Sequence, residues 1–76
     1  MKLPHFSGRE MARLLTRLGF EKVHQVGSHA KFVHPDGRVT MVPMHGNEEL
    51  GTGITLEILK QAEIARDEFI RLARGL

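Results

Sequence analysis

The spacing of apolar residues changes twice along this chain, from a helical period to a strand period and back, and this change restricts the fold more than any other feature. In the first helical stretch the apolar residues stand at positions i, i+3, i+4 and i+7, and they are Met11, Leu14, Leu15 and Leu18. Ser7 and Glu10 precede this face with the spacing of a capping box, and Gly19 follows it as a C-terminal cap. The pattern therefore predicts an amphipathic helix between Ser7 and Gly19.

Between the helical stretches the sequence predicts three short strands, at residues 20–26, 30–34 and 38–43. Gly27-Ser28 separates the first two, and Pro35-Asp36-Gly37 separates the last two, where proline presets φ and glycine permits a positive φ. Pro43 has no N–H to donate to a ladder, so we expect it to end the third strand. These features predict a three-stranded antiparallel meander.

After a polar stretch at residues 45–51 the helical period returns. One predicted helical face consists of Ile54, Ile58, Leu59 and Ala62, and a later one consists of Phe69, Leu72, Ala73 and Leu76. Ala65 lies between these faces and is a poor N-cap, which leaves open whether residues 54–74 form one helix or two. The predicted order is α-β-β-β-α, an α+β fold whose helices pack on one face of the antiparallel sheet.

The length of 76 residues predicts a single domain, residues 1–76, with a thin core, because so short a chain buries only about 60% of its unfolded surface. The sequence contains no cysteine, which excludes disulfides and thiolate metal sites and is typical of a reducing compartment. The amino terminus has no signal-peptide core, and no apolar stretch approaches the roughly 18 residues of a membrane span. We therefore expect a cytoplasmic protein without a membrane partner.

Charge is unevenly distributed along the chain, although the net charge is only +2. Residues 1–45 carry seven basic and three acidic side chains, whereas residues 46–76 carry four basic and six acidic ones. A basic front half favours an anionic partner such as nucleic acid, through attraction and counterion release. A solvated surface with ordinary scatter of charge explains the same counts.

Among the five histidines, His29 has the most suggestive position. It follows Gly27-Ser28 at the start of a predicted strand, where a side chain can face solvent. Histidine exchanges protons near neutral pH, and RNA cleavage needs a base for the 2′-OH proton and an acid for the leaving oxygen. Lys31 lies two residues on, hence on the same strand face, where it can meet a phosphate. An ordinary surface histidine in a turn explains the spacing at least as well.

Three arginines lie at i, i+4 and i+8 of the first predicted helix, opposite its apolar face: Arg9, Arg13 and Arg17. We call this set the arginine stripe. Guanidinium groups match phosphate geometry, so the stripe is suited to following an RNA backbone. It is equally typical of a solubilising helix face.

Other kinds of active site find less support in the sequence. The five-residue spacing of His24, His29 and His34 puts neighbouring histidines on opposite strand faces and does not suit a zinc site. Ser28 and His29 are adjacent in a strand and so do not form a hydrolase dyad. Gly51-Thr52-Gly53 can present amides to a phosphate, although a plain loop and helix cap explains it better. We expect neither a metal nor another cofactor.

Several short motifs together resemble the HicA toxins, also called YcfA-like proteins. The matching residues are Gly19-Phe20, Gly27-Ser28-His29, Phe32, His34-Pro35-Asp36-Gly37-Arg38, Val42-Pro43, His45, Gly51-Thr52 and Ile58-Leu59-Lys60-Gln61-Ala62. The combination of GSH, VPxH and ILKQA in this order is specific, and the likeness covers nearly the whole chain. The resemblance implies a fold like that of the double-stranded-RNA-binding domain, which agrees with the periodicity.

The same resemblance implies a type II toxin that cleaves messenger RNA and is neutralised by a HicB-type antitoxin. It assigns the catalytic role, that of a metal-independent general acid or base, to His29. Gly27 and Ser28 are motif residues, and we place them among the RNA-contacting residues with Lys31, the arginine stripe and His45. His45 corresponds to the VPxH histidine, for which RNA binding, acid–base assistance and loop shaping remain open.

The chain departs from the family pattern at three places. Met44 stands where a basic residue is usual, and Glu48-Glu49-Leu50 stands where lysine is frequent. Both changes remove positive charge near the expected RNA path and lower the affinity for RNA that we expect. Ala62-Glu63-Ile64-Ala65 replaces the usual AGIS, which removes a glycine and an N-cap serine. None of these changes alters His29.

A function of a different class also fits the sequence. A non-catalytic RNA-binding domain of this fold recognises A-form RNA through phosphates and 2′-OH groups and cleaves nothing. Fold-level analogy does not separate the two functions, whereas the histidine of the GSH motif favours the enzyme.

Overall fold

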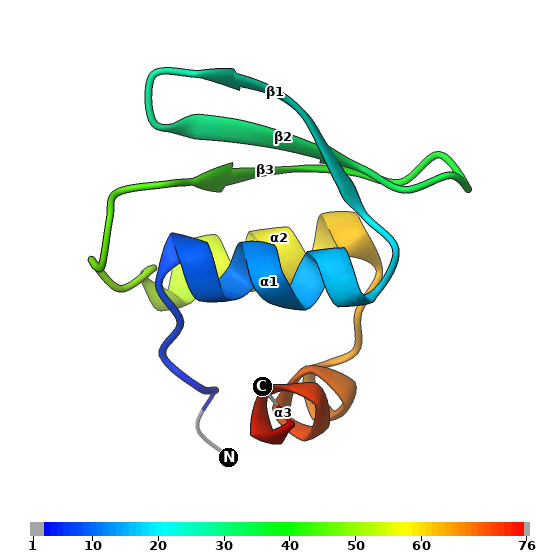
Figure 1. Ribbon diagram of the computed structural model, residues 1–76. Helices are drawn as coiled ribbons and strands as arrows, with labels where there is room; N and C mark the ends of the chain where they lie inside the picture. Colours follow the sequence, from blue (N-terminus) through cyan, green and yellow to red (C-terminus); the bar gives the residue numbers. More distant parts are fainter. Residues whose placement is uncertain (1–2, 76) are drawn as a thin grey trace.

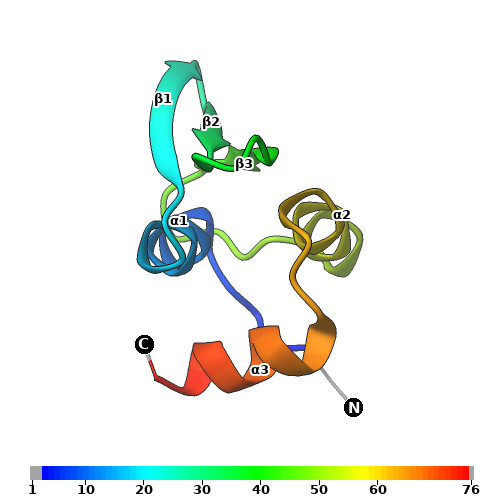
Figure 2. The same ribbon diagram turned by 90° about the vertical axis from the view of Figure 1, so that its right-hand side faces the viewer.

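The computed structural model describes residues 3–75, which contain three helices and three strands (Figure 1). Their bounds are α1 Gly8–Arg17, β1 Glu21–Val26, β2 His29–Val33, β3 Val39–Pro43, α2 Thr52–Ala62 and α3 Arg66–Arg74. The sheet is antiparallel with strand order β1-β2-β3, and α1 and α2 lie side by side on one of its faces (Figure 2). The predicted α+β fold, similar to that of the double-stranded-RNA-binding domain, is confirmed.

The ends of α1 follow the predicted capping chemistry. The Ser7 hydroxyl accepts the Glu10 amide at 3.2 Å, and the Glu10 carboxylate accepts the Ser7 amide at 2.9 Å, which completes the capping box. At the other end Gly19 has a φ of +99°, and the Phe20 amide reaches back to the Leu15 carbonyl at 2.9 Å. The chain therefore turns directly from α1 into β1.

The strands β2 and β3 alternate between a buried and an exposed face. Ala30 and Phe32 of β2 and Thr40 and Val42 of β3 point into the core against the helices. Thr40 is the polar member of this set, and its hydroxyl donates to the Gln61 side-chain oxygen at 2.7 Å. The bond links β3 to α2 and satisfies a polar group that burial would otherwise penalise.

The second helical region consists of two helices, which resolves the open question about residues 54–74. The chain breaks at Glu63, a C-cap with a φ of 56°, and α3 begins after Ala65 without a side-chain cap. Figure 2 shows α3 crossing below α1 and α2 as a third layer. Its Phe69 is buried against Phe6, with an edge-to-face arrangement and 5.2 Å between ring centroids.

The apolar faces predicted for α2 and α3 differ from the structure at Ile54 and are partly buried in α3. Ile54, in the first turn of α2, is 45% exposed, whereas the next residue, Thr55, is buried. Phe69 is buried and Leu72 and Ala73 pack partly against the core, whereas Leu76 lies outside the described residues. No helix within residues 3–75 has the length and apolarity to cross a membrane.

Candidate functional site

Four segments meet at one end of the molecule, at the left of Figure 1: the β1–β2 turn, the end of β3, the loop that follows it and the start of α2. The strand register causes part of this meeting, because it pairs His29, the first residue of β2, with Pro43, the last residue of β3. Residues before β2 and residues after β3 consequently lie next to each other.

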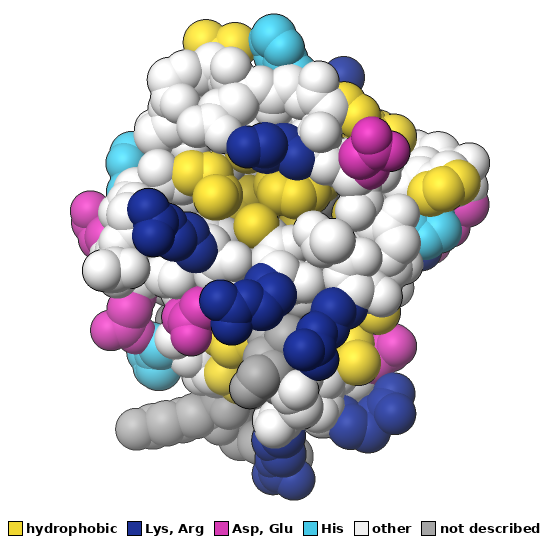
Figure 3. Space-filling model, in the orientation of Figure 1, with side chains coloured by type: hydrophobic (Ala, Val, Ile, Leu, Met, Phe, Trp, Pro, Cys, Tyr) yellow, Lys and Arg dark blue, Asp and Glu magenta, His cyan; other side chains and the backbone are white. Residues whose placement is uncertain are grey.

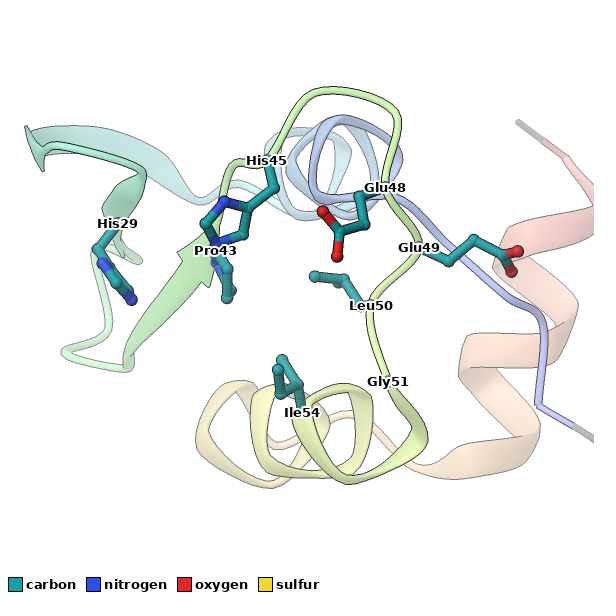
Figure 4. Close-up of a pocket in the computed structure, with 8 residues that line it drawn as sticks. All are labelled: His29, Pro43, His45, Glu48, Glu49, Leu50, Gly51 and Ile54. Carbon is teal, nitrogen blue, oxygen red and sulfur yellow. The ribbon is translucent and has the colours of Figure 1, made fainter.

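A pocket of about 350 Å³ opens at this end (Figure 4). It is lined by His29, Pro43, His45, Glu48, Glu49, Leu50, Gly51 and Ile54. The strands contribute His29 and Pro43, the loop contributes the next four, and the N-cap and first turn of α2 contribute the last two. The pocket therefore combines two histidines, two glutamate residues and an apolar floor.

The two histidines lie close to each other at the pocket. Their ring centroids are 6.4 Å apart and the rings stand at 81° to each other. Both residues are exposed, so a ligand can reach both imidazoles. The separation is too large for a hydrogen bond between the rings, for which nitrogen atoms would have to approach within about 3.2 Å.

Ser28 connects the β1–β2 turn to the second histidine. Its hydroxyl lies 3.4 Å from Nε2 of His45, and its carbonyl accepts the backbone amide of Met44. Gly27 makes this turn possible because its φ of +58° is costly for residues with a side chain. The GSH motif therefore supplies one histidine and holds the loop that carries the other.

The loop after β3 is also attached at its far end. The Leu50 amide donates to the Phe6 carbonyl at 2.7 Å, Glu49 forms a bridge with Ser7, and the Leu50 side chain is buried. Within the loop the Glu48 amide donates to the His45 carbonyl at 3.1 Å. The backbone position of His45 is thus set by hydrogen bonds on both sides.

Acidic side chains form one wall of the pocket. Figure 4 shows the Glu48 carboxylate turned toward the pocket and the Glu49 carboxylate turned away from it. Oε2 of Glu49 lies 3.3 Å from Nδ1 of His5, and both side chains are largely exposed. Glu48 and Glu49, which belong to one of the three departures from the family pattern, therefore line the same pocket as the histidine pair.

The predicted RNA-contacting residues do not all lie at the pocket. Lys31 is exposed on the sheet face that bears no helix, as the alternation of β2 requires. The arginine stripe lies on the exposed surface of α1, and Figure 3 shows basic side chains spread across that side of the molecule. Arg9 lies at the end of α1 near the pocket, whereas Arg17 lies at the opposite end and donates to the Gly75 carbonyl at 3.0 Å.

The remaining histidines are dispersed. His24 is exposed on β1, and His34 is partly buried, with its Nε2 3.1 Å from the Leu18 carbonyl at the end of α1. His34 therefore has a structural partner. Within residues 3–75 no three His, Asp or Glu side chains converge in a geometry that could hold a metal ion.

Sequence reasoning identified His29 but did not place His45 beside it, and it missed Leu50 and Ile54 as walls of the pocket. The sequence did contain a signal for the pairing. A turn centred on Asp36 pairs residue 33 with 39 and residue 29 with 43, which brings the segment after Pro43 next to the GSH motif.

Comparison with known proteins gives one family. A family model described as the HicA toxin of bacterial toxin-antitoxin matches residues 8–64, most of the chain and every residue that lines the pocket. A search among curated proteins gave no significant match.

Proposed function

This chain belongs to the HicA toxin family of bacterial toxin–antitoxin systems, and we propose that it is a type II toxin that cleaves messenger RNA with His29 as general acid or base. The proposal treats residues 1–76 as one cytoplasmic domain that needs no metal. Its cellular partner is a HicB-type antitoxin.

The observation that carries the proposal is the setting of His29. Its imidazole is exposed in a pocket wide enough for a phosphate and a ribose, beside a second histidine and the uncapped start of α2. Cleavage of RNA requires proton transfer at the 2′-OH and at the leaving oxygen, and imidazole suits both transfers near neutral pH.

The surrounding surface offers positions for the rest of the RNA strand. Lys31 continues from His29 along the uncovered sheet face, and Arg9 lies at the pocket end of α1. Gly27 and Ser28 form the turn directly before His29, where backbone groups can approach a phosphate. Phosphate contacts of this kind position the substrate and carry no sequence information.

The decisive experiment compares the purified parent with His29→Ala on end-labelled messenger RNA in the presence of EDTA. We expect the parent to cleave and the variant to be slower by about 10²- to 10⁴-fold, the usual contribution of a positioned acid–base group. His24→Ala, an exposed histidine outside the pocket, is the matched control and should cleave like the parent. Circular dichroism establishes that all three proteins fold.

Two results would contradict the proposal. Equal cleavage by the parent and His29→Ala removes the role of His29. RNA binding by both proteins without any cleavage indicates a non-catalytic RNA-binding domain instead.

A further inference from the structure

The pocket holds a second histidine, and we propose that His45 is the general acid that works opposite His29, with Ser28 as the residue that positions it. This inference rests on the proposed ribonuclease function, because it assigns the second proton transfer of that reaction.

The reaction needs two proton transfers on opposite sides of one phosphorus atom. His29 takes the proton of the 2′-OH as the 2′ oxygen attacks the phosphorus, and a P–O bond forms. The bond from phosphorus to the 5′ oxygen breaks, and His45 gives that oxygen its proton. The products are a 2′,3′-cyclic phosphate and a free 5′-OH, and the two histidines together have moved one proton across the site.

The distance between the two rings is compatible with His29 as the base and His45 as the acid for one phosphate. With ring centroids 6.4 Å apart, one phosphate in the pocket can make a hydrogen bond of about 2.8 Å to each ring, bonding both from the same side rather than standing between them. Both rings are exposed to the same pocket, so a phosphate there can contact both. A lone catalytic histidine would leave the second transfer to water.

Ser28 determines which nitrogen of His45 exchanges the proton. The Ser28 hydroxyl is 3.4 Å from Nε2, and a hydroxyl can accept Nε2–H whether the ring is neutral or charged. Nδ1 is then the nitrogen that can give up its proton. Within residues 3–75, Ser28 is the only hydrogen-bond partner of the His45 ring, so the ring is not a structural anchor.

The charges around His45 favour the acid role for this residue. Glu48 on the same loop lines the pocket and turns its carboxylate toward it, so a negative charge faces the space that the His45 ring also lines. The other titratable groups at the pocket are His29 of β2 and Glu49, whose carboxylate turns away. Pro43 of β3 and Gly51 and Ile54 of α2 contribute no charge.

The test compares two short RNAs that contain one cleavage site mapped with the parent protein. In the second RNA, sulfur replaces the bridging 5′ oxygen at that site, and a thiolate leaves without being protonated. We expect His45→Ala to lose about 10²- to 10⁴-fold on the oxygen substrate and to cleave the sulfur substrate within a few-fold of the parent. His29→Ala should lose activity on both, and His24→Ala should lose it on neither.

The pH–rate profile gives an independent reading. The cleavage rate of the parent should depend on pH in a bell-shaped manner, because the base must be neutral and the acid protonated. His45→Ala should lose the decline at high pH and keep the rise at low pH. Ser28→Ala should lower the oxygen-to-sulfur rate ratio, and Ser28→Thr, which keeps the hydroxyl, should restore it.

The outcomes separate the two proposals. If the parent cleaves and His45→Ala cleaves the oxygen substrate equally fast, or is slowed equally on both substrates, the acid role is overturned while the ribonuclease function stands. If the folded parent cleaves neither substrate, the proposed function itself fails.

Discussion

Single residues connect the β2–β3 turn to the rest of the molecule. The Arg38 guanidinium donates to the Asp36 carboxylate at 2.9 Å and to the Ala62 carbonyl at the end of α2. The same guanidinium lies 5.1 Å from the centroid of the Phe20 ring, at a cation–π distance. Asp36 therefore holds an arginine that bridges the sheet and α2.

This contact predicts a pH dependence of stability. Hydrogen bonds from Arg38 hold the pKa of Asp36 below its ordinary value of 3.8. The folded state thus binds fewer protons at this carboxyl than the unfolded state, so its contribution is complete above about pH 4 and is lost as pH falls through the lowered pKa. Urea unfolding across the acid range should show a steeper loss of stability in the parent than in Asp36→Asn. If the free energy of unfolding falls equally with pH in the parent and in Asp36→Asn, Asp36 does not have this role.

At the scale of elements, α1 and β3 meet without space between them. A Cβ on Gly8 would lie 2.2 Å from the Pro43 carbonyl oxygen and 3.2 Å from the Met44 Cα. The first turn of α1 therefore packs directly against the backbone that leads to His45. Neither contact is with a flexible side chain, so the neighbouring backbone has to move if a side chain is added.

We expect Gly8→Ala to reduce the free energy of unfolding by about 1–3 kcal/mol, the usual cost of overpacking. It should also slow RNA cleavage, because the displaced segment carries His45. Gly53→Ala is the matched control, since a Cβ there meets nothing within 4 Å and a helical alanine is favourable. Denaturant unfolding and the RNA assay measure both effects. If Gly8→Ala is as stable and as active as the parent, the backbone at Pro43 and Met44 accommodates the added methyl group and the prediction is wrong.

At the scale of the whole molecule, three layers share one thin core. The sheet covers one side of α1 and α2, and α3 covers the other (Figure 2). Phe69 is fully buried and is the buried residue of α3. Its partner Phe6 precedes α1, and the carbonyl of Phe6 holds the loop of the pocket through Leu50. The third layer and the candidate site are therefore connected.

Phe69→Ala should cost about 3–5 kcal/mol, as truncation of a buried phenylalanine usually does. A chain of this size has a total stability of roughly 4–11 kcal/mol, so this loss brings the protein close to unfolding. Phe69→Leu, which keeps most of the apolar volume, should lose much less. Urea midpoints of the two variants check this expectation. A loss below about 1 kcal/mol for Phe69→Ala would mean that α3 is dispensable for stability.

Local physical rules determined most of the secondary structure. The capping box at Ser7, the C-terminal cap at Gly19 and the Pro35-Asp36-Gly37 turn act between residues close in sequence, so the sequence predicted them directly. The family motifs also drew attention to His29, which lines the pocket. The break between α2 and α3 stayed open, because Glu63 adopts its left-handed conformation against local preference and no side chain caps α3.

Tertiary structure decided which strand face is buried and which residues share the pocket. In β3 the structure buries Thr40 and Val42 and leaves Val39 and Met41 exposed, and the buried Thr40 hydroxyl donates to the Gln61 side chain on α2. The meeting of His29 and His45 depends on contacts between residues distant in sequence, from Ser28 to Met44 and from Leu50 to Phe6. Periodicity describes one element at a time, whereas the site exists only after separate elements have packed together.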